Sequence, residues 1–190
     1  MTGFCVGHSL TSSTKSKVQV QGITGKGGTV AHVAVQDAYP DDYSHCFGCG
    51  RLNPVGHRLR TFIEGDEAVA RFTPSAHDIA LLGYVYGGLL ASLLDCHGMA
   101  TAAAAAVRAG GHQVGEVPSP RYVTAALHVD YLKPTPLGGE LEVRGRVDEF
   151  SARKVKLSAW VIASGQTTVR ATIVAVPLPD RMRAINTGKA

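Results

Sequence analysis

The segment GLLASLLDCHGMATAAAAAVR, residues 88–108, decides how this chain can fold. It contains no proline and is dominated by alanine and leucine, which favour helix, and Gly110 and Gly111 follow it as a stop signal. At about 1.5 Å per residue this helix is roughly 30 Å long, about the width of a small domain. Its apolar residues fall on every side, so we predict a helix enclosed by the rest of the protein.

Stretches with strand-like patterns lie on both sides of this helix. Residues 124–132 alternate apolar and polar side chains, as a half-buried strand does, and residues 140–147 repeat the pattern. Four further stretches are strand-like: 59–63, 68–73, 155–162 and 169–176. A loop is expected from Pro74 to Gly83. Short turns join the later stretches, so we predict an α+β fold with an antiparallel meander of about five strands against the helix.

Length and composition limit the architecture to one domain with an extension. The chain has 190 residues, of which 45% are hydrophobic and 18% charged, enough for one full domain but not for two large ones. We assign residues 1–40 to an N-terminal extension and residues 41–190 to the domain. The longest apolar stretch, residues 99–107, is about half the roughly 20 residues that span a bilayer, so we expect no membrane insertion.

Charge gives little support for a nucleic-acid partner. The net charge is +4, and residues 1–36 contain three lysines and no acidic residue, so the rest of the chain carries about +1. Nucleic-acid binding requires lysine and arginine clustered on one face, and we expect no such partner.

Residues 1–17 lack the apolar core of a secretory signal, which favours a cytoplasmic location. Their serine- and threonine-rich, acid-free composition leaves a transit peptide as the alternative.

The candidate chemistry lies at the start and in the middle of the predicted helix. Gly87 and Gly88 stand where the helix begins, so their amide groups can face an anion or a developing oxyanion. Asp95 is a carboxylate among leucines, and its cost of burial must be offset either by a structural hydrogen bond or by a functional role. Gly87 and Asp95 are about 12 Å apart along one helix, too far to serve one carbonyl carbon. Two antiparallel helices across a two-fold axis would bring them together, which predicts a dimer with shared sites.

Three segments resemble a known family. They are CFGCGRLNPVG (46–56), YGGLLASLLD (86–95) and VTAALHVDYLKPTPLG (123–138). Together, in this order, they resemble the PaaI-like hotdog-fold acyl-CoA thioesterases, and the resemblance extends over residues 45–177.

The resemblance implies a long helix wrapped by a curved antiparallel sheet, dimers that often pair into tetramers, and hydrolysis of an acyl-CoA to a carboxylic acid and CoA without a cofactor. It places the catalytic carboxylate at Asp95 and the amide that holds the thioester oxygen at Gly87. Thr124 corresponds to a threonine that helps to position water or the carboxylate. Many members have histidine before the glycine pair, and here the residue is Tyr86, which can donate a hydrogen bond but cannot take up a proton near neutral pH.

Basic and aromatic side chains are candidates for binding the substrate. Lys133, Arg153 and Lys154 follow strand ends, where they can meet the phosphates of CoA or simply remain solvated. Tyr131 and Trp160 can line an acyl tunnel or belong to the core.

We predict no metal site. Cys46 and Cys49 form a C-x-x-C motif with His45 and His57 nearby, but a second ligand pair at standard spacing is missing. Cys96 is expected to behave as a small hydrophobic residue, and His97 as an interior histidine that points away from Asp95.

Three other functions remain open at this point. A non-catalytic acyl-CoA-binding protein would use the same fold and would bind without releasing thiol. A hotdog hydratase would need a histidine about five residues after Asp95, and residue 100 is alanine. An interaction module independent of CoA is supported only by the glycine-rich N-terminal residues.

Overall fold

The computed structural model describes residues 33–183, so most of the predicted N-terminal extension lies outside the described residues. Two 3-10 helices, η1 (Val35–Ala38) and η2 (Asp41–Tyr43), come first, and two α-helices follow later, α1 (Gly87–Ala109) and α2 (Asp180–Arg183). The strands are β1 (Thr61–Glu64), β2 (Glu67–Phe72), β3 (Ile79–Leu81), β4 (Tyr84–Val85), β5 (Tyr122–Tyr131), β6 (Leu141–Phe150), β7 (Val155–Ala163) and β8 (Gln166–Pro177).

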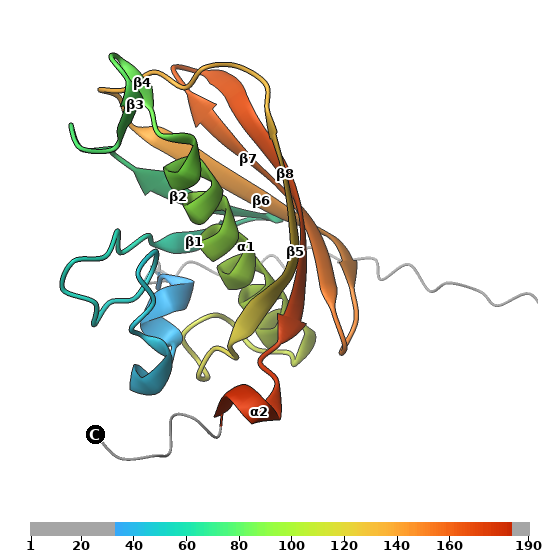
Figure 1. Ribbon diagram of the computed structural model, residues 1–190. Coiled ribbons are helices and arrows are strands. Elements are labelled where there is room, and N and C mark those ends of the chain that lie inside the picture. The colour runs from blue at the N-terminus through green and yellow to red at the C-terminus, as the bar shows by residue number, and fades with distance from the viewer. Residues whose placement is uncertain (1–32, 184–190) are drawn as a thin grey trace, which may run out of the picture. The chain divides into compact units, whose positions relative to one another are not determined.

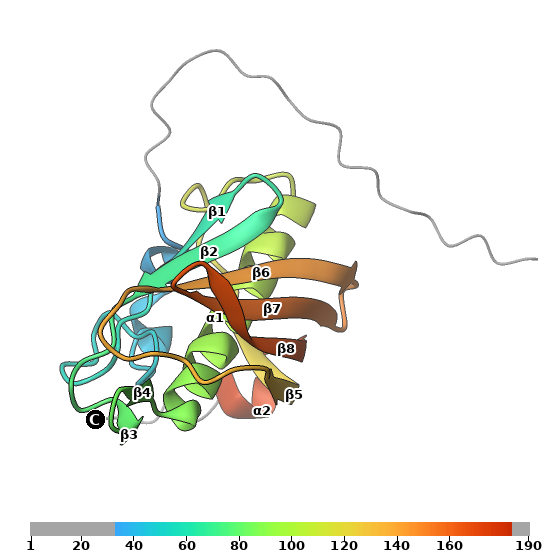
Figure 2. The ribbon, with the colours of Figure 1, turned by 90° about the horizontal axis from the view of Figure 1, so that it is seen from above.

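Six of these strands form one antiparallel sheet in the order β1-β2-β6-β7-β8-β5. The sheet curves, and α1 runs across its concave face (Figure 1). The view from above shows the same arrangement, with β5 at one edge of the sheet (Figure 2). This is the hotdog arrangement that the resemblance implies, so the predicted α+β fold is confirmed.

Two details of the predicted topology are wrong. The meander holds for β6, β7 and β8, but β5 pairs with β8 rather than with its sequence neighbour β6. Alternation shows that a segment is a strand, whereas the choice of neighbour depends on where the crossing connection leads. The segment predicted as a loop before Gly83 also contains β3, which pairs with β4 in a small separate sheet.

The central helix is confirmed to within one residue at each end, and most of it is buried. Gly98 allows the closest approach to the sheet, because a Cβ atom there would lie 2.7 Å from Cδ1 of Ile173. By length and composition α1 could also cross a membrane, but 72% of its most apolar window is buried inside the protein. That burial is typical of the core helix of a soluble protein.

One side of α1 is only partly enclosed, contrary to the prediction. Ala91, Ser92 and Asp95 in the first half of the helix are only half-buried, and so are Ala105 and Ala106 near its end, whereas Gly98 and Ala102 on the same side between them are buried. The single chain therefore leaves two short parts of its central helix half-buried, and Asp95 lies on the first of them.

His97 lies on the opposite, buried side of α1, as predicted for an interior histidine. The Gln36 amide donates to the Thr61 hydroxyl over 3.1 Å, which leaves the Thr61 proton for His97 Nδ1, also 3.1 Å away. Gly145 packs against the imidazole, since a Cβ there would lie 3.0 Å from Nε2. Burial favours the neutral ring and lowers the pKa of His97 to about 4.

This burial predicts a loss of stability in mild acid. The unfolded chain takes up a proton on His97 near pH 6.5, whereas the folded protein does so only near pH 4. The free energy of unfolding should therefore fall as the pH drops from about 6.5 to about 4, by about 3 kcal/mol from this residue. Urea unfolding of the wild type and of His97→Gln across this range measures the effect, and His77→Gln, at an exposed histidine, is the control. An equal pH dependence in all three proteins would contradict the assignment.

Candidate functional site

The first turn of α1 is shaped by two glycines and two tyrosines. Tyr86 is the residue before the helix, and its carbonyl accepts from the amides of Leu89 and Leu90 over 3.1 and 3.4 Å. The amides of Gly87 and Gly88 precede this first helical hydrogen bond and therefore have no intrahelical carbonyl to donate to. They form the positive end of the helix dipole, which suits an oxygen that becomes negative.

Aromatic rings flank both glycines. The hydroxyl of Tyr131, at the end of β5, donates to the Gly87 carbonyl over 2.8 Å, and its ring would lie 3.3 Å from a Cβ at residue 87. The ring of Tyr86 covers Gly88 so closely that a Cβ there would overlap it. Tyr86 is 56% exposed. Gly88 is therefore a space requirement of this helix start, whereas a Cβ at residue 87 needs only a small shift of the Tyr131 ring.

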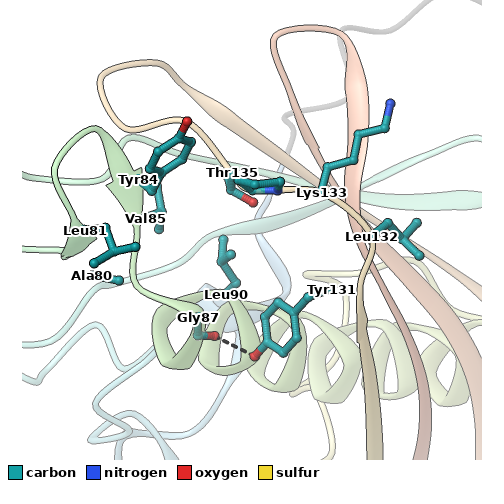
Figure 3. Close-up of a pocket in the computed structure, with 11 residues that line it drawn as sticks. Ala80, Leu81, Tyr84, Val85, Gly87, Leu90, Tyr131, Leu132, Lys133 and Thr135 are labelled. Carbon is teal, nitrogen blue, oxygen red and sulfur yellow. Dashed lines mark hydrogen bonds between the residues drawn. The ribbon is translucent and has the colours of Figure 1, made fainter.

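A pocket of about 530 Å³ opens beside this helix start. Its lining is mainly apolar and comes from the segment around β3 and β4, from α1 and from the chain after β5: Ala80, Leu81, Tyr84, Val85, Gly87, Leu90, Tyr131, Leu132, Lys133, Pro134 and Thr135. Figure 3 shows the Lys133 side chain extending away from Gly87, and its ammonium donates to the Gln166 side chain over 2.8 Å. Of the two aromatic candidates from the sequence, Tyr131 lines this pocket and Trp160 does not.

Asp95 and Thr124 are brought together by the packing of α1 against β5. The Thr124 hydroxyl donates to Oδ1 of Asp95. A register shift lies between Thr124 and Ala126, and such irregularities bend an edge strand and redirect its side chains. The carboxylate is half-buried rather than enclosed, so the predicted burial is wrong for the single chain.

The predicted site residues fall into two groups at opposite ends of the sheet. Thr124 pairs with Ala175, which pairs with Val155, so the β6–β7 turn that carries Arg153 and Lys154 lies at the Asp95 end. Lys133 contacts Gln166 at the other end, roughly 25 Å away along the strands, close to Gly87. Within one chain the structure therefore brings Asp95 to Thr124, and it places Lys133 and Gly87 in the lining of one pocket, but it does not bring the two groups together.

A third cluster was missed by reasoning from spacing. The sulfur atoms of Cys46, Cys49 and Cys96 all lie within 4.8 Å of one another. Hydrogen bonds from Cys49 and Cys96, together with the amides of Cys49 and Gly48, hold the pKa of the Cys46 thiol well below its ordinary value. The hydrogen bond to Cys46 raises the pKa of Cys96. Because Cys96 is 47 residues from Cys49 in sequence, only the packing of the loop on α1 reveals the trio.

Comparisons with known proteins show which family shares this fold. The thioesterase superfamily profile matches residues 82–173. A solved thioesterase superfamily protein from Shewanella loihica is 42% identical, with a TM-score of 0.57, over 73% of this chain and 98% of that one. The PaaI protein of the Escherichia coli phenylacetic acid degradation operon shares the fold at 17% identity and a TM-score of 0.51, over 64% of this chain and 78% of that one.

A Streptococcus mutans protein solved with bound acetyl-CoA also shares the fold, at 16% identity and a TM-score of 0.50, over 63% of this chain and 88% of that one. A search of curated proteins found no match. The profile match to residues 82–173 covers α1 and most of the sheet, and the Shewanella protein is similar over almost its whole length. This chain belongs to the thioesterase superfamily.

Proposed function

We propose that the protein hydrolyses an acyl-CoA thioester to a carboxylic acid and CoA. The observation that carries the proposal is the half-buried Asp95 carboxylate, held by the Thr124 hydroxyl, in a chain whose central helix also begins with two glycine amides beside an apolar pocket. Membership of the thioesterase superfamily supports the reaction class. The acetyl-CoA bound to the Streptococcus mutans protein of the same fold supports the ligand class.

The site is proposed to form between two copies of the chain. β5 is the last strand of the sheet, and no strand among residues 33–183 pairs with its outer edge, which leaves backbone groups that a second copy can use. Large exposed apolar side chains gather around the start of α1 and the end of β5, as expected of an interaction surface: Leu81, Leu82, Tyr84, Tyr86, Tyr131 and Leu132.

A two-fold arrangement also unites the two separated groups of residues. If the helices lie antiparallel, Gly87 of one copy faces Asp95 of the other, and two equal sites result. Each site then receives Lys133 with the glycines, and Arg153 and Lys154 with Asp95, so that basic side chains reach the CoA phosphates from both copies. We infer a homodimer as the smallest active unit, with a dimer of dimers as its larger form.

The proposed reaction begins with attack on the thioester carbonyl. In one route Asp95 takes a proton from water, the water oxygen bonds to the carbonyl carbon, and the carbonyl oxygen becomes an oxyanion facing the Gly87 and Gly88 amides. The carbon–sulfur bond then breaks, and the proton passes from Asp95 to the departing CoA thiolate. In the other route an Asp95 oxygen bonds to the carbonyl carbon, the carbon–sulfur bond breaks and CoA leaves as the thiolate, and water then hydrolyses the resulting anhydride.

Thr124 and Tyr86 have supporting roles in this proposal. The Thr124 hydroxyl fixes the orientation of the carboxylate and leaves Oδ2 for water or for the carbonyl carbon. Tyr86 is exposed and packs on Gly88, so it helps to shape the helix start and can offer its hydroxyl to the substrate.

The three free thiols of Cys46, Cys49 and Cys96 fit the proposed cytoplasmic location, where thiols remain reduced.

The first test removes the charge of Asp95. Asp95→Asn keeps the size of the side chain and can still accept from Thr124, so it should fold and assemble normally. It should lose about 10² to 10⁴ in kcat across a panel of acyl-CoA substrates, followed by reaction of the released thiol with a dye. Normal turnover by this variant would remove Asp95 from the mechanism. Wild-type protein that binds acyl-CoA without releasing thiol would identify the non-catalytic alternative.

The second test removes one amide proton without removing the backbone. Proline is favoured at the first position of a helix, and the extended backbone of Tyr86 (φ −63°, ψ 126°) suits a following proline. Gly87→Pro should therefore preserve α1 and lower kcat by about 10² to 10³, the usual effect of losing one oxyanion donor. Gly87→Ala adds the same Cβ but keeps the amide, and it should retain most of the activity. Equal activity in the two variants would exclude the Gly87 amide as an oxyanion donor.

The third test asks whether the site is shared. An equal mixture of Asp95→Asn and Gly87→Pro chains, unfolded and refolded together, should contain hybrid dimers in which one site has both defects and the other has none. About half of the dimers are hybrids with one intact site of two, so the mixture should recover about a quarter of wild-type activity. Sites built within one chain would give no recovery above the two parents.

A further inference from the structure

The cysteine trio lies outside the proposed catalytic groups and has its own geometry. Cys46 and Cys49 come from the loop before β1, and Cys96 comes from the middle of α1. Cys49 and Cys96 are buried, and Cys46 is partly exposed. We propose that these three thiols bind one zinc ion, which ties the loop to the central helix. This inference does not depend on the proposed hydrolytic activity, and it revises the sequence-based expectation of no metal.

The distances between the sulfur atoms suit a tetrahedral ion. Zinc binds thiolate sulfur at about 2.3 Å, so two sulfurs on one tetrahedral ion are about 3.8 Å apart. Cys46 and Cys96 Sγ are 3.7 Å apart, and all three sulfurs lie within 4.8 Å of one another. A disulfide would require about 2.05 Å. Three soft ligands at this spacing select zinc over the oxygen-binding ions, magnesium and calcium.

The loop is built as a tight turn around the Cys46 sulfur. The Gly50 amide donates to the Cys46 carbonyl over 2.7 Å, and the amides of Gly48 and Cys49 are directed at the Cys46 side chain. A Cβ at residue 50 would lie 2.5 Å from backbone atoms of Cys46, and a Cβ at residue 48 would overlap the Cys96 sulfur. These glycines allow the turn to seat directly on α1 with its two thiols facing the third.

The charge around the trio suits a divalent ion. Three thiolates and Zn²⁺ carry a net charge of −1, and Nη1 of Arg121 lies 3.9 Å from Cys49 Sγ. The Arg121 guanidinium is held there by the Tyr39 ring, whose centroid is 5.1 Å from Cζ. One protein cation therefore balances one excess negative charge. The fourth tetrahedral position is left for water or a small ligand, reached from the partly exposed Cys46 side.

The test uses the full chain, reduced and stripped of metal with a chelator under anaerobic conditions. Titration with Co²⁺ should give sulfur-to-cobalt charge-transfer bands that saturate at one ion per chain, and one equivalent of Zn²⁺ should remove them. Zinc should raise the Tm of the wild type, and the chelator should reverse the shift.

Variants show which thiols hold the ion. Cys46→Ser, at the partly exposed position, should still fold, but it should lose the charge-transfer bands and the zinc-dependent Tm shift. Cys49→Ser should give the same result. Cys5→Ser removes the fourth cysteine of the chain and should bind as the wild type does. Absence of cobalt bands in reduced wild-type protein, unchanged bands in Cys46→Ser, or formation of a Cys46–Cys96 disulfide in place of metal binding would each overturn the proposal.

Discussion

The rigidity of one helix is the constraint on which the proposed chemistry depends. α1 cannot bend to bring Gly87 near Asp95, because its buried side is packed on the sheet over most of its length, with Gly98 in close approach to Ile173. About 12 Å of helix therefore separates the proposed oxyanion donors from the carboxylate. A chain that carries both groups on one helix can combine them only by using the helix of a second copy, and Asp95 lies on a part of α1 that the single chain leaves half-buried.

The sequence predicted those elements whose signal is local. The 23-residue helix follows from its composition and its glycine stop, and the strands of the main sheet follow from alternation. The position of β5 could not be predicted in this way, because pairing with β8 instead of β6 is decided by a crossing connection and not by the pattern of either strand. The burial of Asp95 was overestimated for a related reason. Apolar neighbours on a helix show that the helix is central, but they do not show which stripe the same chain covers.

The candidate site also contains residues that the sequence could predict and residues that only the structure reveals. The resemblance indicated Thr124 and Asp95 residue by residue, and the structure adds the hydrogen bond between them. Tyr131 gained a specific place only in three dimensions, where its hydroxyl bonds the Gly87 carbonyl. Cys96 was interpreted as a small hydrophobic residue because its partners are distant in sequence. Metal-ligand spacing is a local signal, and a trio completed by a residue on a distant helix does not show it.

Three consecutive residues of α1 explain how these features are connected. Successive residues on a helix point about 100° apart, so Asp95, Cys96 and His97 face three different parts of the protein. Asp95 meets Thr124 on the edge strand, Cys96 meets the thiols of the loop, and His97 meets the buried Thr61. The contacts of Cys96 and His97 fix the rotation of the helix about its axis, and Asp95 lies on the half-buried side. A zinc ion bound to Cys96 would fix the helix one residue from the Asp95 carboxylate. The buried His97 imidazole would fix the opposite side of the helix. The proposed metal could therefore influence the proposed chemistry without touching substrate, because fixing the rotation of the helix also fixes the direction of Asp95 toward the proposed second chain.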